Sequence, residues 1–200
     1  MKVHVESLIE RIVQAYASAR LYTDRGTVAL DLATISLRAE FETSFERPDR
    51  FLFSVSVTAL EDGGSKYRYA HRLLAEGTDL RLGDPEWRTG RPESLASAVA
   101  CLTGVSYGSA HIIPRLLMPG KIDGRALFDW PERTLDEPAM IDGAPHFVIK
   151  LRKNEEEERV YVSEATLVVR RIEWNGPVPR SPDRFTTTDY FAVLSPNTVS

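Results

Sequence analysis

The chain has 200 residues, of which 42% are hydrophobic and 27% charged, and its formal net charge is -4. These values are typical of one soluble globular domain over residues 1–200, with a core that needs no disulfide or metal. Because the basic residues are scattered singly, the sequence argues against nucleic acid and anionic membrane surfaces as main partners.

The N-terminal stretch "MKVHVESLIERIVQAY" has no continuous apolar run before its first acidic residues. It therefore predicts neither a signal peptide nor a membrane span. We expect a protein of the cell envelope if an export signal has been trimmed from this sequence, and a cytoplasmic one if the sequence is complete. From Val3 to Arg20, apolar residues recur at steps of three and four, which predicts an amphipathic helix.

Antiparallel strands are predicted after this helix, because the hydrophobic pattern changes to period two. "LRAEFETSFE" and "RFLFSVSVTAL" alternate apolar and polar residues, and "ERPDR" between them predicts a hairpin turn. Beyond a second turn at "EDGGS", "KYRYAHRLLAEG" is a further alternating segment. The first third is thus predicted to be a helix followed by a β-meander from about Tyr22.

Two short apolar helices are predicted in the middle of the chain. The first, in "RPESLASAVACLTG", has Pro92 and Glu93 in its first turn and Gly104 as its C-cap. The second, in "GSAHIIPRLLMPG", has Ser109 as its N-cap and ends at "MPG". The connecting "TGVSYGS" contains Gly104 and Gly108, which we identify as candidate hinge residues.

Strands resume after Gly120. They are predicted in "TLDEPAMIDG", "APHFVIKLR", "ERVYVSE", "TLVVRRIEW" and "DRFTTTDYFAV". The charge run "KNEEEER" lies at a predicted hairpin tip and is interpreted as a solvated turn. The one cysteine, Cys101, has no histidine or cysteine at ligand spacing, so neither a metal site nor a cofactor is expected.

The segment "GVSYG" satisfies G-x-S-x-G, the pattern of a nucleophilic serine at a strand-to-helix turn. Ser106, with Asp123 or Asp142 and with His146, would meet the order of a hydrolase triad. However, the preceding "SLASAVACL" has helical spacing, whereas such a turn requires a buried strand there. A serine hydrolase is therefore retained only as a remote alternative, and we expect no catalytic residues.

The order of elements resembles the outer-membrane lipoprotein carrier superfamily (LolA/LolB-like). The resemblance rests on "IVQAYASARLYTDRGTV", "FETSFERPDRFLFSV", "SLASAVACLTGVSYGSAHIIPRLLMP", "LVVRRIE" and "TTTDYFAVLSPN". It implies an α+β fold, mainly antiparallel β, in which a half-barrel of strands surrounds an apolar cavity and the helices cover its concave face. In such carriers the cavity takes the acyl chains of a lipoprotein, and related members act as envelope-stress sensors.

The candidate site consists of apolar residues on both sides of that cavity. On the concave face they are Phe41, Phe45, Phe51, Phe53, Val55, Tyr67 and Tyr69. On the covering helices they are Ile112, Ile113, Leu116, Leu117 and Met118. The leading hypothesis is a monomeric, non-enzymatic carrier for a lipid, acyl chain or other hydrophobic ligand. The alternative is a protein-interaction or sensor domain with a peptide or protein partner.

Overall fold

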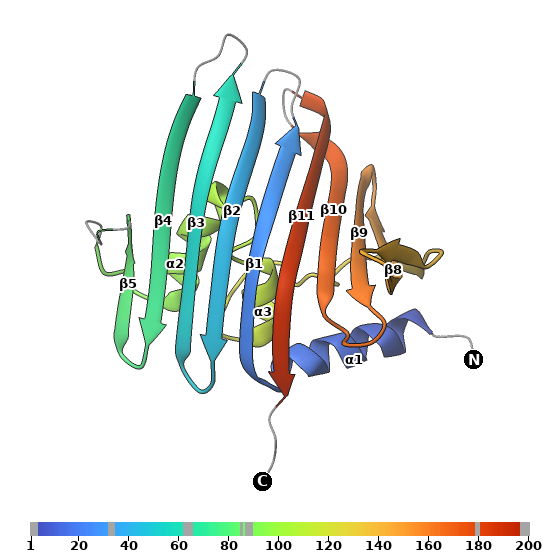
Figure 1. Cartoon of the computed structure of the whole chain (residues 1–200), viewed down its shortest axis with the longest axis horizontal. Coiled ribbons are helices and arrows are strands. Elements are labelled where there is room, and N and C mark those ends of the chain that lie inside the picture. The colour runs from blue at the N-terminus through green and yellow to red at the C-terminus, as the bar shows by residue number, and fades with distance from the viewer. Residues whose placement is uncertain are drawn as a thin grey trace.

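One antiparallel sheet organises the protein (Figure 1). The computed structural model describes residues 4–31, 35–61, 66–84, 86, 90–178 and 181–196. The 11 strands run in the order β5-β4-β3-β2-β1-β11-β10-β9-β8-β6, and β7 also pairs with β8. Among the described residues no pairing joins the two end strands, β5 and β6, so the sheet does not close into a barrel.

The described helices are α1 (Val5–Ala17), α2 (Leu95–Val105) and α3 (Ile112–Leu117). The strands are β1 (Ala19–Asp31), β2 (Ile35–Glu46), β3 (Arg50–Glu61), β4 (Lys66–Glu76), β5 (Asp79–Gly83), β6 (Glu132–Leu135), β7 (Ala139–Ile141), β8 (Ala144–Lys153), β9 (Glu156–Ser163), β10 (Val169–Val178) and β11 (Ser181–Pro196). These ranges reproduce the predicted element order.

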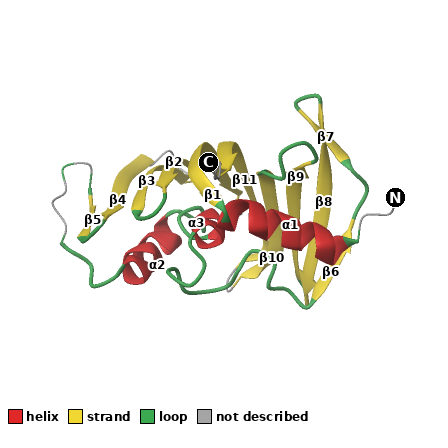
Figure 2. Ribbon diagram, turned by 90° about the horizontal axis from the view of Figure 1, so that it is seen from below, coloured by secondary structure: helices red, strands yellow, loops and turns green. Residues whose placement is uncertain are grey.

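All three described helices lie on the same side of the curved sheet, as Figure 2 shows. We call this side the concave face and the opposite side the helix-free face. The predicted α+β half-barrel, with an N-terminal helix and two central helices over the concave face, is confirmed. An open sheet with one apolar face requires such a cover, because an uncovered face would expose its core side chains to water.

The alternation predicted for the strands determines which side chains meet the helices. In β3, Phe51, Phe53 and Val55 are buried, whereas the intervening Leu52 is exposed and Ser54 half-buried. Successive side chains of a strand point to opposite faces, so each strand contributes every second residue to the core.

The two halves of the chain meet through the pairing of its first and last strands. β1 to β5 form one meander and β8 to β11 form another. Strands β1 and β11 then pair from Ala19 opposite Pro196 to Asp31 opposite Phe185. This pairing converts two local meanders into one continuous sheet.

Arg47, in the β2–β3 turn, ties the C-terminal ends of helices α1 and α3 to the sheet. Its guanidinium donates to the carbonyl oxygens of Ala17 and Leu117, the latter at 2.7 Å, and its Nε donates to Ala19 O at 2.7 Å. Ala17 and Leu117 are the last residues of α1 and α3. A cation is favourable at these positions, because the final carbonyls of a helix lack partners and carry partial negative charge.

The predicted start and end of the first central helix and the predicted start of the second are wrong, whereas the second helix ends at "MPG" as predicted. Helix α2 begins only after Ser94, because the Ser94 and Ser97 side chains form a capping box, so Pro92 and Glu93 precede the helix. Gly104 lies inside α2 rather than after it. Ser109 is not the N-cap of α3, since its hydroxyl donates to Ser106 O at 2.9 Å and the helix starts after His111.

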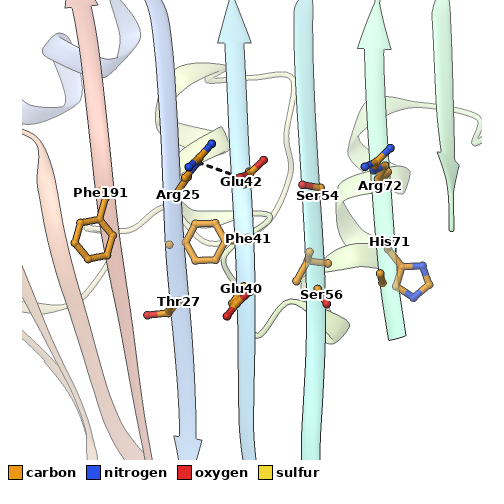
Figure 3. Close-up of a pocket in the computed structure, with 13 residues that line it drawn as sticks. Arg25, Thr27, Glu40, Phe41, Glu42, Ser54, Ser56, His71, Arg72 and Phe191 are labelled. Carbon is orange, nitrogen blue, oxygen red and sulfur yellow. Dashed lines mark ion pairs between the residues drawn. The ribbon is translucent and has the colours of Figure 1, made fainter. Parts of the chain in front are cut away.

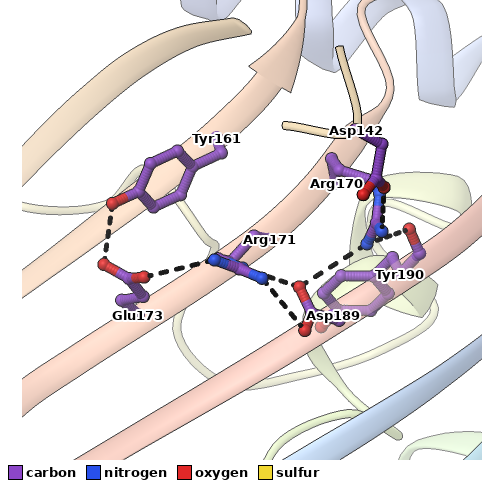
Figure 4. Close-up of polar contacts among 7 residues, drawn as sticks. All are labelled: Asp142, Tyr161, Arg170, Arg171, Glu173, Asp189 and Tyr190. Atoms are coloured by element: carbon purple, nitrogen blue, oxygen red, sulfur yellow. Dashed lines mark hydrogen bonds and ion pairs between the residues drawn. The ribbon is translucent and has the colours of Figure 1, made fainter. Parts of the chain in front are cut away.

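A β-bulge in β10 places Arg170 and Arg171 together on the helix-free side (Figure 4). Arg171 Nε is 2.7 Å from Asp189 Oδ1 on the neighbouring strand. Arg170 lies over the Phe191 ring, 4.0 Å from its centroid, and is 2.8 Å from Asp142 Oδ2. Because of the extra residue in the bulge, both arginines can pair with acidic side chains of the β7–β8 turn and of β11.

We predict that Gly26→Ala destabilises the protein by about 3 kcal/mol or more. Gly26 lets the Phe41 and Tyr190 rings meet above β1 with centroids 5.4 Å apart. A Cβ there would overlap the Phe41 ring and lie 2.5 Å from Asp189 O, so backbone and side chains would both have to shift. Chemical denaturation measures the change, and an unfolding free energy equal to that of the wild type would contradict this packing.

Candidate ligand-binding site

Two of the cavities around helix α2 are lined by the sheet, one on each side of the helix. One, of about 260 Å³, lies between the α2–α3 connection and strands β9 to β11. The other, of about 540 Å³, lies between α2 and strands β4 and β5. Helix α2 has mostly small side chains, and only Ala98, Val99 and Leu102 are buried, so it fills the space above the sheet incompletely.

We call the smaller one the joint cavity. Its lining residues come from α2, the α2–α3 connection, α3, the segment before β6, and strands β9 to β11. They are Thr103, Tyr107, Gly108, His111, Ile112, Arg125, Leu127, Glu158, Ile172, Trp174, Thr186 and Thr188. Apolar and polar groups therefore share one small enclosure.

The polar part of the joint cavity comes from the sheet. Glu158 is 2% exposed and Thr186 is 7% exposed. Among the described residues, Thr186 Oγ1 is a buried side-chain oxygen without a hydrogen-bond partner. Buried polar atoms are normally paired, so a buried carboxyl and an unpaired hydroxyl lining one cavity are unusual for this face.

The solvated-turn interpretation of "KNEEEER" is correct for the exposed Asn154 and Glu155 but wrong for Glu158. Strand β9 begins at Glu156, so alternation places Glu158 on the concave face with Val160 and Val162. Period two extended backwards from these valines would have identified it. Because nearly every residue of this segment is charged, the alternation of buried and exposed positions cannot be recognised from its composition.

The buried carboxyl of Glu158 has a cationic neighbour. Arg125 Nη2 is 3.2 Å from Glu158 Oε2, and the Arg125 guanidinium lies over the Trp130 ring, 4.3 Å from its centroid. Burial raises the pKa of Glu158 to about 7, although Arg125 opposes the shift. Burial also lowers the pKa of His111, whose Nε2 is 2.8 Å from Asp123 O, so its ring is neutral near pH 7.

The larger cavity, which we call the α2–β4 cavity, is mainly apolar. Leu82, Pro92, Leu102 and Val105 contribute to its wall. Cys101 also lines it and is exposed. Its thiol therefore offers an accessible position beside this space.

The structure places most of the predicted site residues in the packed core. Of the concave-face set, Phe41, Phe45, Phe51, Phe53 and Val55 are buried. Tyr69 is half-buried, and its hydroxyl donates to Val105 O at 3.4 Å. The side chain of Tyr67 lies outside the described residues.

On the helices, Ile113, Leu116, Leu117 and Met118 are buried, and Ile112 lines the joint cavity. Sequence reasoning missed the polar residues Glu158, Thr186 and Thr188. The sequence analysis assigned only apolar residues and tyrosines to the concave face, whereas the structure buries these three polar side chains there as well.

The "GVSYG" segment forms the bend between α2 and α3. Tyr107 and Gly108 both have positive φ, at 54° and 92°. Ser106 is fully buried, and its hydroxyl oxygen accepts a hydrogen bond from the Ala110 N–H at 3.1 Å. Its side chain thus stabilises the bend, and the segment preceding it is helix α2 rather than the buried strand that a nucleophile elbow requires.

The other residues of the hypothetical triad belong to different parts of the fold. His146 is on β8, where its Nδ1 is 2.9 Å from Ala144 O, and Asp142 is in the β7–β8 turn. Asp123 presents its carbonyl oxygen to His111. The geometry gives no support to a triad at Ser106.

Two further properties bear on the site. Within the described ranges, no three acidic, histidine or cysteine side chains gather closely enough to hold a metal ion. Within the same ranges, no helix is long and apolar enough to cross a membrane.

The helix-free face has a groove of about 440 Å³ across β1 to β4 (Figure 3). Ser54 and Ser56 line it, with the Arg25–Glu42 ion pair, 3.0 Å between Nε and Oε1, on one side. Phe191 borders it and is 58% exposed. Charged and hydroxyl side chains border the groove, which is about as open to solvent as the cavities around α2.

A second buried carboxyl lies on the concave face, on β1. Asp24 Oδ2 accepts a hydrogen bond from the Tyr22 hydroxyl at 2.7 Å. Burial raises the pKa of Asp24 to about 6, against the opposing effect of this hydrogen bond. The Tyr16 hydroxyl beside it accepts from the Val169 N–H at 2.9 Å and links helix α1 to β10.

No protein-family model matches the sequence, and no curated protein sequence matches it. Similar solved structures include MucB, with 14% identity and a TM-score of 0.46 over 97% of this chain and 60% of that one. They also include the MucA/MucB complex of Pseudomonas aeruginosa, with 12% identity and a TM-score of 0.45 over 98% and 59%. A LolA superfamily protein from Nitrosomonas europaea has 12% identity and a TM-score of 0.36 over 100% and 96%. The chain thus spans about three fifths of the MucB chains.

We predict opposite effects for alanine at the two candidate hinge glycines. Gly104 is inside α2 and a Cβ there meets nothing within 4 Å, so Gly104→Ala should stabilise the protein by about 0.5 to 1 kcal/mol. Gly108 has positive φ, and its Cβ would lie 3.3 Å from Ile112 Cδ1, so Gly108→Ala should cost about 1 to 2 kcal/mol. Equal unfolding free energies for the two variants would contradict this account of the bend.

The raised pKa values also predict how stability depends on pH. Between about pH 4 and 7 the folded protein binds more protons at Asp24 and Glu158 than the unfolded chain, so the free energy of unfolding falls as pH rises. Each carboxyl contributes up to about 3 kcal/mol to this fall. Glu158→Gln should flatten the curve, whereas Glu157→Gln, on the opposite face of β9, should not. Parallel curves for the wild type and Glu158→Gln in denaturant titrations would refute the assignment.

Proposed function

We propose that this protein is a non-enzymatic binding protein for an acyl chain or a similar hydrophobic ligand on its concave side. The observation that carries the proposal is the pair of cavities flanking helix α2, about 260 and 540 Å³ in volume. Concave space with apolar walls and a few polar groups is typical of small-molecule sites.

The way α2 is attached supports a role for this helix in admitting the ligand. Its polar contact with the sheet is the 3.4 Å hydrogen bond from the Tyr69 hydroxyl to Val105 O. The helix buries only three of its side chains, and the bend at residues 106–108 follows it directly. A helix with few buried contacts separates from its support at low cost, so α2 can shift to join the two cavities around one chain.

A second candidate function, binding of a protein partner, is favoured by the helix-free face. Phe191 and Val193 on β11 are 58% and 65% exposed, and the groove of Figure 3 lies beside Phe191. Exposed aromatic and aliphatic side chains beside polar groups are a feature of protein interfaces.

Cys101 permits a direct test of the first function. The chain has one cysteine, and it borders the α2–β4 cavity, so an environment-sensitive thiol dye there should report an entering acyl chain. Titration with monolauroylglycerol should give a saturable blue shift in emission. The dye senses the change because the chain displaces water from the apolar wall.

The matched control carries the dye on the other face, as Cys101→Ser combined with Ser54→Cys in the helix-free groove. No saturable shift is expected there. If neither position responds, or both respond alike, acyl binding on the concave side is refuted and the partner-binding function becomes the better explanation.

A further inference from the structure

We infer that the joint cavity is a head-group site for amphiphiles that carry an ammonium group, held by the Glu158 carboxylate. This inference rests on the proposed function, because the alkyl chain of the same molecule would occupy the apolar space beside α2. It adds the chemical class of the ligand, which the apolar walls alone leave undefined.

The cavity contains one carboxyl, Glu158, and one guanidinium, Arg125, and they differ in how firmly the fold holds them. Glu158 projects from the sheet and is 2% exposed, whereas the side chain of Arg125 comes from the segment before β6 and is 44% exposed. The carboxyl is therefore held in place by the strand, while the guanidinium can rotate into solvent. A buried charge that cannot move selects ligands of the opposite sign, because its field is weakly screened there.

Arg125 already shows how a cation fits this position. Its guanidinium pairs with Glu158 at 3.2 Å and stacks on Trp130 at 4.3 Å. A carboxylate beside an aromatic face is the usual arrangement for binding alkylammonium groups. An ammonium head entering the cavity would replace Arg125 at the carboxylate, and Arg125 would turn to solvent.

The hydroxyls of β11 lie in the same cavity, on the other side of Trp174 from Glu158. Thr186 and Thr188 both line the joint cavity and are buried. Within the described part of the chain, Thr186 Oγ1 has no hydrogen-bond partner. An ammonium group has up to three N–H donors and no acceptor, so once one donor is held by Glu158 the others can face the polar β11 side of the cavity.

An anionic head fits the same walls poorly. A carboxylate in the cavity would lie beside Glu158, and its attraction to Arg125 would compete with the pair already formed. The His111 ring adds no compensating charge, because burial lowers its pKa. An uncharged head would gain little from the carboxylate, since a neutral hydrogen bond is weaker than a charge-assisted one.

The charged groups around Glu158 determine how binding depends on pH. Arg125 lowers its pKa and Glu156 raises it, while burial has the largest effect and sets the pKa at about 7. The Tyr190 hydroxyl also senses this carboxyl and stays protonated, since burial raises its pKa. An ammonium ligand requires the ionised carboxylate, so its affinity should be full above pH 7 and fall about tenfold per pH unit well below it.

The experiment compares three ligands with the same chain and different heads. Isothermal titration calorimetry at pH 8 should show octylammonium binding at least about tenfold more tightly than octanol, and octanoate weakest. Glu158→Gln should remove the preference for octylammonium and leave octanol unchanged. Glu157→Gln makes the same charge change on the helix-free side of β9 and should preserve the preference.

A second variant tests whether the ligand takes the place of Arg125. At pH 9, where Glu158 is ionised, Arg125→Ala should bind octylammonium more tightly than the wild type, because no internal cation must be displaced. If octanoate binds best, or if octylammonium and octanol bind equally in the wild type and in Glu158→Gln, the head-group inference fails while acyl binding stands. If none of the three ligands binds and the Cys101 dye does not respond, both fail.

Discussion

The apolar face of an open sheet must be kept from water. The position of the helices that cover this face determines where the cavities and the buried polar groups of the protein lie. Three helices cover the face, and Arg47 holds the ends of two of them by donating to Ala17 O and Leu117 O. Helix α1 is fixed further by the Tyr16 hydroxyl, which accepts from the Val169 N–H. Helix α2 is joined to the sheet by a longer hydrogen bond, from the Tyr69 hydroxyl to Val105 O at 3.4 Å, and two cavities flank it.

The polar groups under this cover are costly for folding. Asp24 and Glu158 are buried carboxyls, and burial raises both pKa values, which means that ionising them opposes the folded state. A core selected for stability alone would carry apolar residues at such positions. Glu158 lines the joint cavity, and the proposed binding function gives a reason for a carboxyl at this buried position. Asp24 lies instead within a packed tyrosine cluster and lines none of the cavities described above.

The bend between α2 and α3 joins two of the helices that cover the sheet. Its conformation depends on Ser106, whose hydroxyl accepts from the Ala110 N–H, and on the positive φ of Tyr107 and Gly108. The same segment forms part of the wall of the joint cavity. The G-x-S-x-G pattern therefore belongs to a structural element of the candidate site. Its serine stabilises the bend through a hydrogen bond, whereas the sequence had offered a catalytic role as the alternative.

The sequence by itself determined the elements and their faces. Period two in "RFLFSVSVTAL" and the helical spacing of "VESLIERIVQAY" specify local geometry and which side is apolar, and both follow from side-chain direction within one element. The sequence analysis placed the start of α2 at Pro92 and Glu93, whereas the capping box at Ser94 starts the helix after that residue. Only the tertiary structure decided that β1 pairs with β11, and that Glu158 and Thr186 line the same cavity as His111. These groups are brought together by contacts between distant parts of the chain, and periodicity within a segment carries no information about which distant segment it will meet.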